Sequence, residues 1–179
     1  MPMIGSWELD AASEPEKWFA HARAYLDASI HLCEGMISGT FPQTYSNGQV
    51  ILGLAHHSVE LFYKGAIHRA TRQMPGSTHN LHTLEEKLKQ VAPEIASSFT
   101  SPFGLEAIPA GLNATALEKA IGNERDQRFR YHHDQEGNPW SGVQGFTAET
   151  FLAKLRYCSS QYDANIPNSG QSRNEQSWR

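Results

Sequence analysis

Apolar residues recur at intervals of three and four along most of the chain, which is the spacing of amphipathic helices. The first of these runs follows Ser13, whose hydroxyl can cap free backbone N–H groups, and the acid–proline–acid triplet at 14–16 suits a first helical turn. The run extends to about Met36, and Gly39 is typical of a residue that ends a helix. The pattern therefore predicts one long N-terminal helix.

A second, longer run predicts a helix from near Thr44 or Ser46 to Gln73, where a Met-Pro-Gly sequence ends it. A helix of this size is about 40 Å long at 1.5 Å per residue, which suits the central member of a bundle. A broad apolar stripe is expected to be buried, and its positions are Val50, Ile51, Leu54, Ala55, Leu61, Phe62 and Ala66.

Shorter helical segments follow, separated by prolines and glycines. The predicted positions are Leu81, Leu84, Leu88 and Val91 in one helix, 112–121 in another, and Phe151, Leu152, Leu155 and Cys158 in a last helix that Thr147 caps. No alternating pattern is strong enough to predict a sheet. The fold class is therefore predicted to be all-α.

The chain length of 179 residues fits one domain. We expect an N-terminal arm over 1–13, a helical bundle over 14–165, and a polar, disordered tail over 166–179. No apolar run approaches the roughly 18 residues of a membrane span, and the N-terminus does not resemble a signal peptide. These features favour a cytoplasmic protein that does not contact a membrane.

Cysteine content and charge narrow the function classes. Cys33 and Cys158 each fall in a helical pattern and are expected to be buried thiols. The formal net charge is −4, so a nucleic-acid partner would have to meet a local basic patch.

Residues 55–88 carry a combination of positions that is informative about the family. A small residue is followed on one helix by a glutamate and, four positions later, a lysine; after a turn, His-x-Leu opens the next helix. These residues are Ala55, Glu60, Lys64, His79, Leu81 and Leu84. The combination resembles the core of the HEPN (higher eukaryotes and prokaryotes nucleotide-binding) domain.

This resemblance implies a four- to five-helix, up-and-down bundle that forms a homodimer. Some family members are metal-independent endoribonucleases with an Arg-x(4–6)-His motif, so no cofactor is expected. Others bind nucleotides, or serve as partners of nucleotidyltransferases or other proteins, for instance in toxin–antitoxin pairs. The leading hypothesis is nucleotide or RNA binding, with ribonuclease activity as its catalytic form. The alternative is a non-catalytic interaction module.

The arginine-rich segment 124–134 (ERDQRFRYHHD) fits the family's position for the catalytic motif. Histidine suits proton transfer at a ribose 2′-hydroxyl, and arginine offers a permanently charged fork to phosphate oxygens. The candidate phosphate-binding residues here are Arg128, Arg130 and Tyr131.

Two arginine–histidine pairs are compatible with the motif spacing. Arg125 and His132 leave six residues between them, with the polar Asp126 following the arginine. Arg128 and His133 leave four, but an aromatic residue follows Arg128. On a continuous helix residues 125, 128 and 132 share a face, so Arg125 with His132 is the better pair. In the catalytic hypothesis His132 or His133 transfers protons, Arg125 steadies the phosphate and Asp126 orients one of them.

The same segment also has a structural interpretation. Arg130 and Tyr131, with Asp134 and Gly137 after them, resemble family members in which this segment is a loop held by arginine and tyrosine. The acidic residues of the segment could neutralise its arginines. Backbone conformation would decide between the two interpretations.

Lys64 and His79 are weaker candidates for nucleotide or phosphate binding. Lys64 and Glu60 are spaced i,i+4, which most often indicates a surface ion pair, and His79 more often braces a turn. Lys64 also belongs to a basic cluster at the end of the second helix. The histidine pairs lack metal-ligand spacing, so no metal site is predicted.

Overall fold

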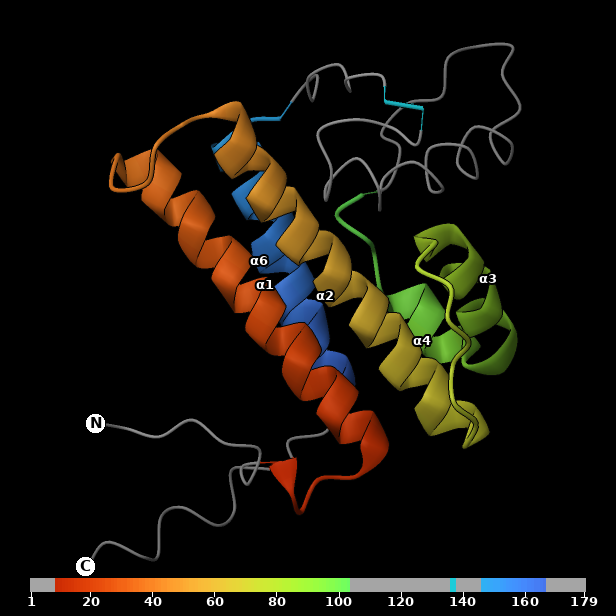
Figure 1. Ribbon diagram of the computed structural model, residues 1–179. Helices are drawn as coiled ribbons and strands as arrows, with labels where there is room; N and C mark the ends of the chain where they lie inside the picture. The colour runs from red at the N-terminus through yellow and green to blue at the C-terminus, as the bar shows by residue number, and fades with distance from the viewer. Residues whose placement is uncertain (1–8, 104–135, 138–145, 167–179) are drawn as a thin grey trace, which may run out of the picture.

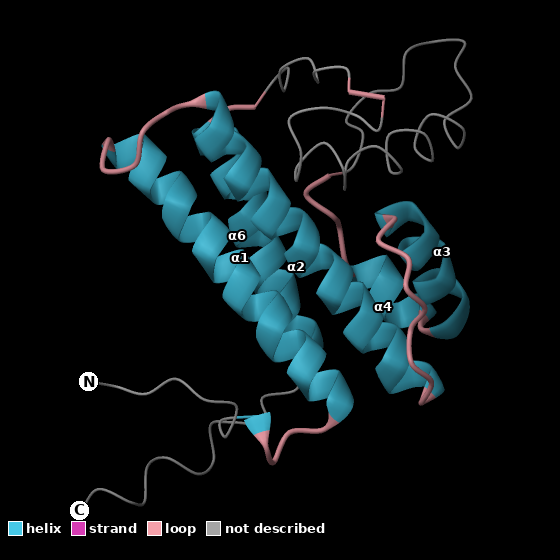
Figure 2. Ribbon diagram, in the orientation of Figure 1, coloured by secondary structure: helices cyan, strands magenta, loops and turns pink. Residues whose placement is uncertain are grey.

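The computed structural model describes residues 9–103, 136–137 and 146–166. Within these ranges every regular element is a helix, which confirms the all-α prediction (Figures 1 and 2). The elements are α1 (Glu14–Ser38), α2 (Tyr45–Thr71), α3 (Leu81–Val91), α4 (Pro93–Ser98) and α6 (Ala148–Asn165). Helix α1 packs along both α2 and α6, α3 packs against α2, and α4 packs against α3 (Figure 1).

The helix ends follow the local chemistry predicted from the sequence. At the start of α1 the Glu16 carboxylate accepts a hydrogen bond from the Ser13 backbone N–H at 2.6 Å, which completes a capping box. Gly39 ends α1 with a φ of 79°, a left-handed conformation that glycine adopts without strain. Thr44 and Thr147 cap α2 and α6.

The burial of α2 differs in part from the predicted stripe. Ile51, Ala55, Phe62 and Ala66 are fully buried, as expected, and Leu61 is buried too. Val50 is 49% exposed, however, and Leu54 is only partly buried. Farther along, every residue over 58–67 is buried, because α1 and α3 pack against this part of the helix and Tyr162 of α6 stacks on Phe62. Helical periodicity could not anticipate burial on all sides.

Aromatic stacking and one buried hydroxyl pair join α2 to α6. The Phe62 ring stacks on Tyr162 with centroids 4.5 Å apart, and on Phe99 at 4.6 Å. Ser58 donates its single hydroxyl hydrogen to the Ala22 carbonyl at 2.6 Å. The Tyr162 hydroxyl, 3.0 Å from Ser58 Oγ, is therefore the donor in that pair. This chain of hydrogen bonds connects α1, α2 and α6 inside the core.

Gly65 allows α1 and α2 to approach closely. A Cβ at this position would lie 2.9 Å from the Phe19 ring and 3.0 Å from Trp18 Cβ, both on α1. Side chains larger than a hydrogen therefore do not fit without a shift of α1. The contact places Trp18 beside the polar residues of α2 described below.

Both cysteines are buried free thiols, as predicted. Burial raises the pKa of Cys33 to about 11 and that of Cys158 to about 12. Both side chains therefore stay protonated and serve as core residues.

Candidate functional site

The buried carboxylate of Glu60 lies at the centre of a cluster of polar side chains. Glu60 has a side chain only 2% exposed, and its two oxygens accept three hydrogen bonds. Oε1 accepts from Lys64 Nζ at 2.7 Å and pairs with His79 Nδ1 at 3.0 Å. Oε2 pairs with His57 Nδ1 at 3.3 Å. The Glu60–Lys64 ion pair is thus buried, and the surface location predicted for it was wrong.

The hydrogen bonds keep this carboxylate ionised. Burial by itself would raise the pKa of Glu60, because a charge is poorly solvated in the core. The hydrogen bonds from His57 and Lys64, the positive charge of Lys64 and the hydrogen bond from His79 outweigh burial and lower the pKa to about 2. Glu60 is therefore an anion at neutral pH, paired with one fixed cation.

Helix periodicity and one turn bring these residues together. His57, Glu60 and Lys64 lie at i, i+3 and i+7 on α2, so they share a face of the helix. His79 comes from the connection between α2 and α3, just before the N-cap Asn80. His79 thereby braces the turn, in agreement with the structural role expected for it.

Two aromatic side chains of α1 border the cluster. The Lys64 ammonium lies 5.9 Å from the centroid of the Trp18 ring. The Tyr25 ring meets the His57 ring edge-on, with centroids 4.6 Å apart. Trp18 and Tyr25 are both half-buried and are spaced i,i+7, so they lie on one face of α1. We call Trp18, Tyr25, His57 and His79 the histidine–aromatic surface.

The histidine–aromatic surface contains two imidazoles that reach solvent and are held by the buried Glu60 carboxylate. The His57 side chain is 33% exposed and that of His79 is 47% exposed, while Lys64 is only 6% exposed. An ionised carboxylate only accepts hydrogen bonds, so each imidazole offers its Nδ1–H to Glu60. A carboxylate that fixes a histidine tautomer in this way is typical of acid–base sites.

The structure separates Lys64 from the basic cluster expected at the end of α2. Lys64 is neutralised by Glu60, and Arg69 donates a hydrogen bond to the Asn165 carbonyl at 3.0 Å while its guanidinium lies over the Phe19 ring. These two cations therefore belong to different contacts within the bundle and do not form one phosphate-binding patch.

The seven candidates in the arginine-rich segment lie outside the described residues. They are Arg125, Asp126, Arg128, Arg130, Tyr131, His132 and His133. The histidine–aromatic surface includes three residues that sequence reasoning missed, namely Trp18, Tyr25 and His57. The spacing of His57 and Glu60 at i,i+3 was the available signal for one of them.

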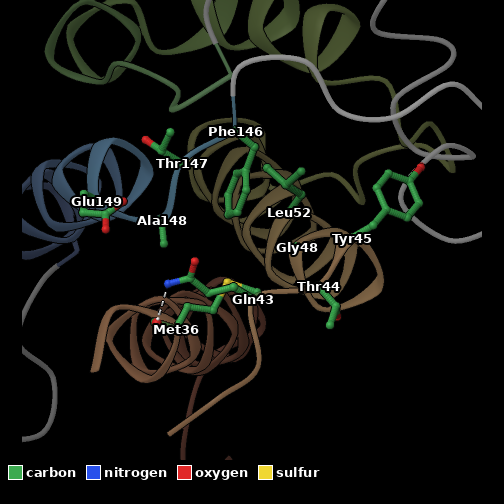
Figure 3. A pocket seen from close by; sticks show the side chains of 10 residues that line it. All are labelled: Met36, Gln43, Thr44, Tyr45, Gly48, Leu52, Phe146, Thr147, Ala148 and Glu149. Carbon is green, nitrogen blue, oxygen red and sulfur yellow. Dashed lines mark hydrogen bonds between the residues drawn. The ribbon is translucent and has the colours of Figure 1, made fainter. Parts of the chain in front are cut away.

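A half-open pocket of about 360 Å³ lies at the other end of α2 (Figure 3). The C-terminal part of α1 and the N-termini of α2 and α6 surround it, and Met36, Leu52 and Phe146 are the larger apolar side chains that line it. Gln43 spans its edge, where Nε2 donates a hydrogen bond to the Met36 carbonyl at 2.9 Å. The pocket does not include the Glu60 cluster.

None of the helices in the described ranges has the length and apolar character that a membrane span requires. Over residues 9–103, 136–137 and 146–166, no group of three histidine, cysteine or acidic side chains has a geometry that could hold a metal ion.

Comparison with protein-family models, with curated proteins and with solved structures finds no match for this chain.

Proposed function

We propose that this protein is an HEPN-like domain that binds a nucleotide or RNA on the histidine–aromatic surface. The observation that carries the proposal is the buried Glu60 carboxylate, which holds two partly exposed imidazoles beside two half-buried aromatic rings. Aromatic and imidazole rings stack on nucleobases, and such stacking tolerates different bases. Imidazole Nε2 atoms can donate hydrogen bonds to phosphate when they are protonated.

Electrostatics support a ligand recognised by stacking more than by charge. The Glu60–Lys64 pair is neutral, and the whole chain carries a formal charge of −4. A neutral aromatic surface can bind the bases of a single strand or a mononucleotide without a large basic patch. In the HEPN-like proposal the arginines of segment 124–134 supply the phosphate contacts, and two copies of the chain form a homodimer.

The test is a binding titration with labelled single-stranded RNA and with mononucleotides, in EDTA, followed by fluorescence anisotropy. Base–aromatic stacking contributes about 1–3 kcal/mol per base, so Tyr25→Leu should weaken binding about 5- to 150-fold. Tyr157→Leu is the matched control, because Tyr157 is 58% exposed on α6. Equal affinity of the two variants, or no saturable binding by the wild type, contradicts the proposal.

A protein-interaction role is the second candidate, favoured by apolar side chains in the first half of α2. Tyr45 is 48% exposed and Val50 is 49% exposed, and the partly buried Leu54 lies one turn beyond Val50. The partner could be a second copy of the chain or a nucleotidyltransferase. Light scattering of wild type and Val50→Asp tests self-association: loss of a dimer in the variant supports this surface, and a dimer unchanged by the variant removes it.

A further inference from the structure

We infer that the pocket between the N-termini of α2 and α6 binds a small uncharged molecule with an aromatic ring and one hydrogen-bond donor, such as a phenol. The inference goes beyond the proposed nucleotide or RNA binding and does not depend on it, because none of the described residues that line the pocket belongs to the histidine–aromatic surface. The volume of about 360 Å³ lies at the lower end of the range for small-molecule sites, so the ligand is small.

The apolar lining of the pocket favours an aromatic ring. Met36 of α1 and Leu52 of α2 are buried, and the Phe146 ring packs on Phe151 of α6 with centroids 5.6 Å apart. A thioether and a phenyl ring both make favourable contacts with an aromatic ring. Gly48 leaves space beside Phe146, since a Cβ there would lie at an ordinary contact distance of 3.5 Å from the ring. A planar ring in the pocket would therefore meet groups that favour it.

Gln43 provides a hydrogen-bond acceptor of fixed orientation. Its Nε2 donates a hydrogen bond to the Met36 carbonyl at 2.9 Å, which determines the end of the amide that carries the nitrogen. In Figure 3 its Oε1 points from Met36 towards Ala148, into the pocket, and it accepts no hydrogen bond from the described residues. An acceptor in this position is complementary to a hydroxyl or N–H donor of the ligand.

The charges around the pocket favour an uncharged ligand. Among the described residues that line it, Glu149 alone carries a charge. The N-termini of α2 and α6 each carry about half a unit of positive charge from the helix dipole, so together they offset about one carboxylate. A phosphate or carboxylate ligand therefore gains little from this pocket.

The test is a calorimetric titration of the protein with three related probes, together with thermal unfolding at the same ligand concentrations. The first probe, para-cresol, has both the ring and the donor. The second, para-methylanisole, carries a methyl group in place of the hydroxyl hydrogen and has no donor. The third, para-toluate, has the ring and an anionic carboxylate.

The expected result is that para-cresol binds with a Kd of about 0.1–1 mM, which is ordinary for a ligand of this size. It should raise the unfolding temperature by about 3–6 °C at about ten times the Kd. The other two probes should bind about 2- to 13-fold more weakly, which is the effect of one lost hydrogen bond.

Substitutions at two positions locate the site. Gln43→Leu should abolish the difference in affinity between para-cresol and para-methylanisole, while Gln90→Leu, at an exposed position on α3, should keep it. Gly48→Leu should fill the pocket and remove the binding of all three probes. Thermal unfolding without ligand reports folding. If Gly48→Leu does not fold, Gly48→Ala replaces it, since its methyl group occupies part of the same space and should weaken binding.

Several results would overturn the inference. Tighter binding of para-toluate than of para-cresol would show that the helix N-termini, and not Gln43, select the ligand. Equal binding of para-cresol and para-methylanisole by the wild type, para-cresol affinity unchanged in the Gly48 variants, or no saturable binding of para-cresol up to about 10 mM would each remove the site. The RNA-binding proposal stands or falls separately, because Tyr25→Leu tests it on another surface.

Discussion

His79 Nδ1 lies 3.0 Å from Glu60 Oε1, although the two residues are 19 positions apart and His79 belongs to no helix. The contact attaches the connection between α2 and α3 to the buried centre of α2. It also gives His79 a fixed tautomer while 47% of its side chain stays exposed. One hydrogen bond therefore has both a structural and a chemical consequence.

Removal of either member of the buried ion pair should be costly. Lys64→Met leaves an uncompensated carboxylate in the core and Glu60→Gln leaves an uncompensated ammonium, so each should lower the free energy of unfolding by about 3–5 kcal/mol. The double variant should lose less than the sum of the two single losses. Urea denaturation measures all three.

The control for the ion pair is Lys89→Met. Lys89 pairs with Glu85 at the same i,i+4 spacing, at 2.9 Å, but its side chain is 50% exposed. Solvent screens this pair, so the variant should change stability little. Similar losses for Lys64→Met and Lys89→Met would contradict the buried, functional interpretation of the Glu60 cluster.

Stability should depend on pH through Glu60. Its pKa is lowered from 4.5 in an ordinary carboxyl to about 2 in the fold, so the unfolded chain binds a proton more readily than the folded chain between these values. The stabilisation that Glu60 contributes is therefore complete above about pH 4.5. It is lost as the pH falls towards 2, which lowers the free energy of unfolding by about 2–3 kcal/mol.

The corresponding measurement is the urea midpoint of wild type and Glu60→Gln from pH 7 down to pH 3. Glu60→Gln should be less stable at pH 7 and should lose less stability on acidification than the wild type. Glu94→Gln, at an exposed carboxylate on α4, should keep the wild-type slope. Parallel curves for wild type and Glu60→Gln would show that Glu60 is not the titrating group.

Two glycines of α2 should respond to alanine in opposite ways. Alanine normally favours a helix over glycine by about 1 kcal/mol. At Gly65 the added methyl would lie 2.9 Å from the Phe19 ring, so Gly65→Ala should destabilise the fold by about 1–3 kcal/mol. At Gly48 the nearest atom is 3.5 Å away, so Gly48→Ala should be neutral or stabilising. Denaturant midpoints of both variants test the closeness of α1 and α2.

The Tyr162 hydroxyl should contribute to stability because it donates the buried hydrogen bond to Ser58 Oγ at 3.0 Å. Tyr162→Phe leaves the ring stack on Phe62 in place and should cost about 1 kcal/mol. Tyr157→Phe removes a hydroxyl from a side chain 58% exposed and should cost almost nothing. Equal unfolding temperatures of Tyr162→Phe and wild type would place the hydroxyl in contact with water.

Helix positions could be predicted from the sequence because they depend on local chemistry. The capping box of Ser13 and Glu16, the left-handed Gly39 and the caps at Thr44 and Thr147 each act within a few residues of one helix end. The inward-facing side of α6 followed from helical periodicity for the same reason. The arginine-rich segment was also identified from residue types, and its role stays a prediction.

The candidate site could not be predicted in the same way. Glu60–Lys64 and Glu85–Lys89 have the same spacing, yet the first pair is buried and the second is exposed. The spacing of two residues in the sequence shows whether they share a helix face, whereas their burial depends on the neighbouring helices that cover that face.

The sequence by itself therefore determined the three long helices, the caps at their N-termini and most of the core, because caps and periodicity are properties of neighbouring residues. It did not predict the short helix α4, and it placed the end of α2 at Gln73 where the helix ends at Thr71. Only the tertiary structure decided that His79 reaches Glu60 across a turn and that Tyr25 of α1 borders His57 of α2. Contacts between separate elements depend on how closely the helices pack. That distance is set by residues such as Gly65, which lie outside the site itself.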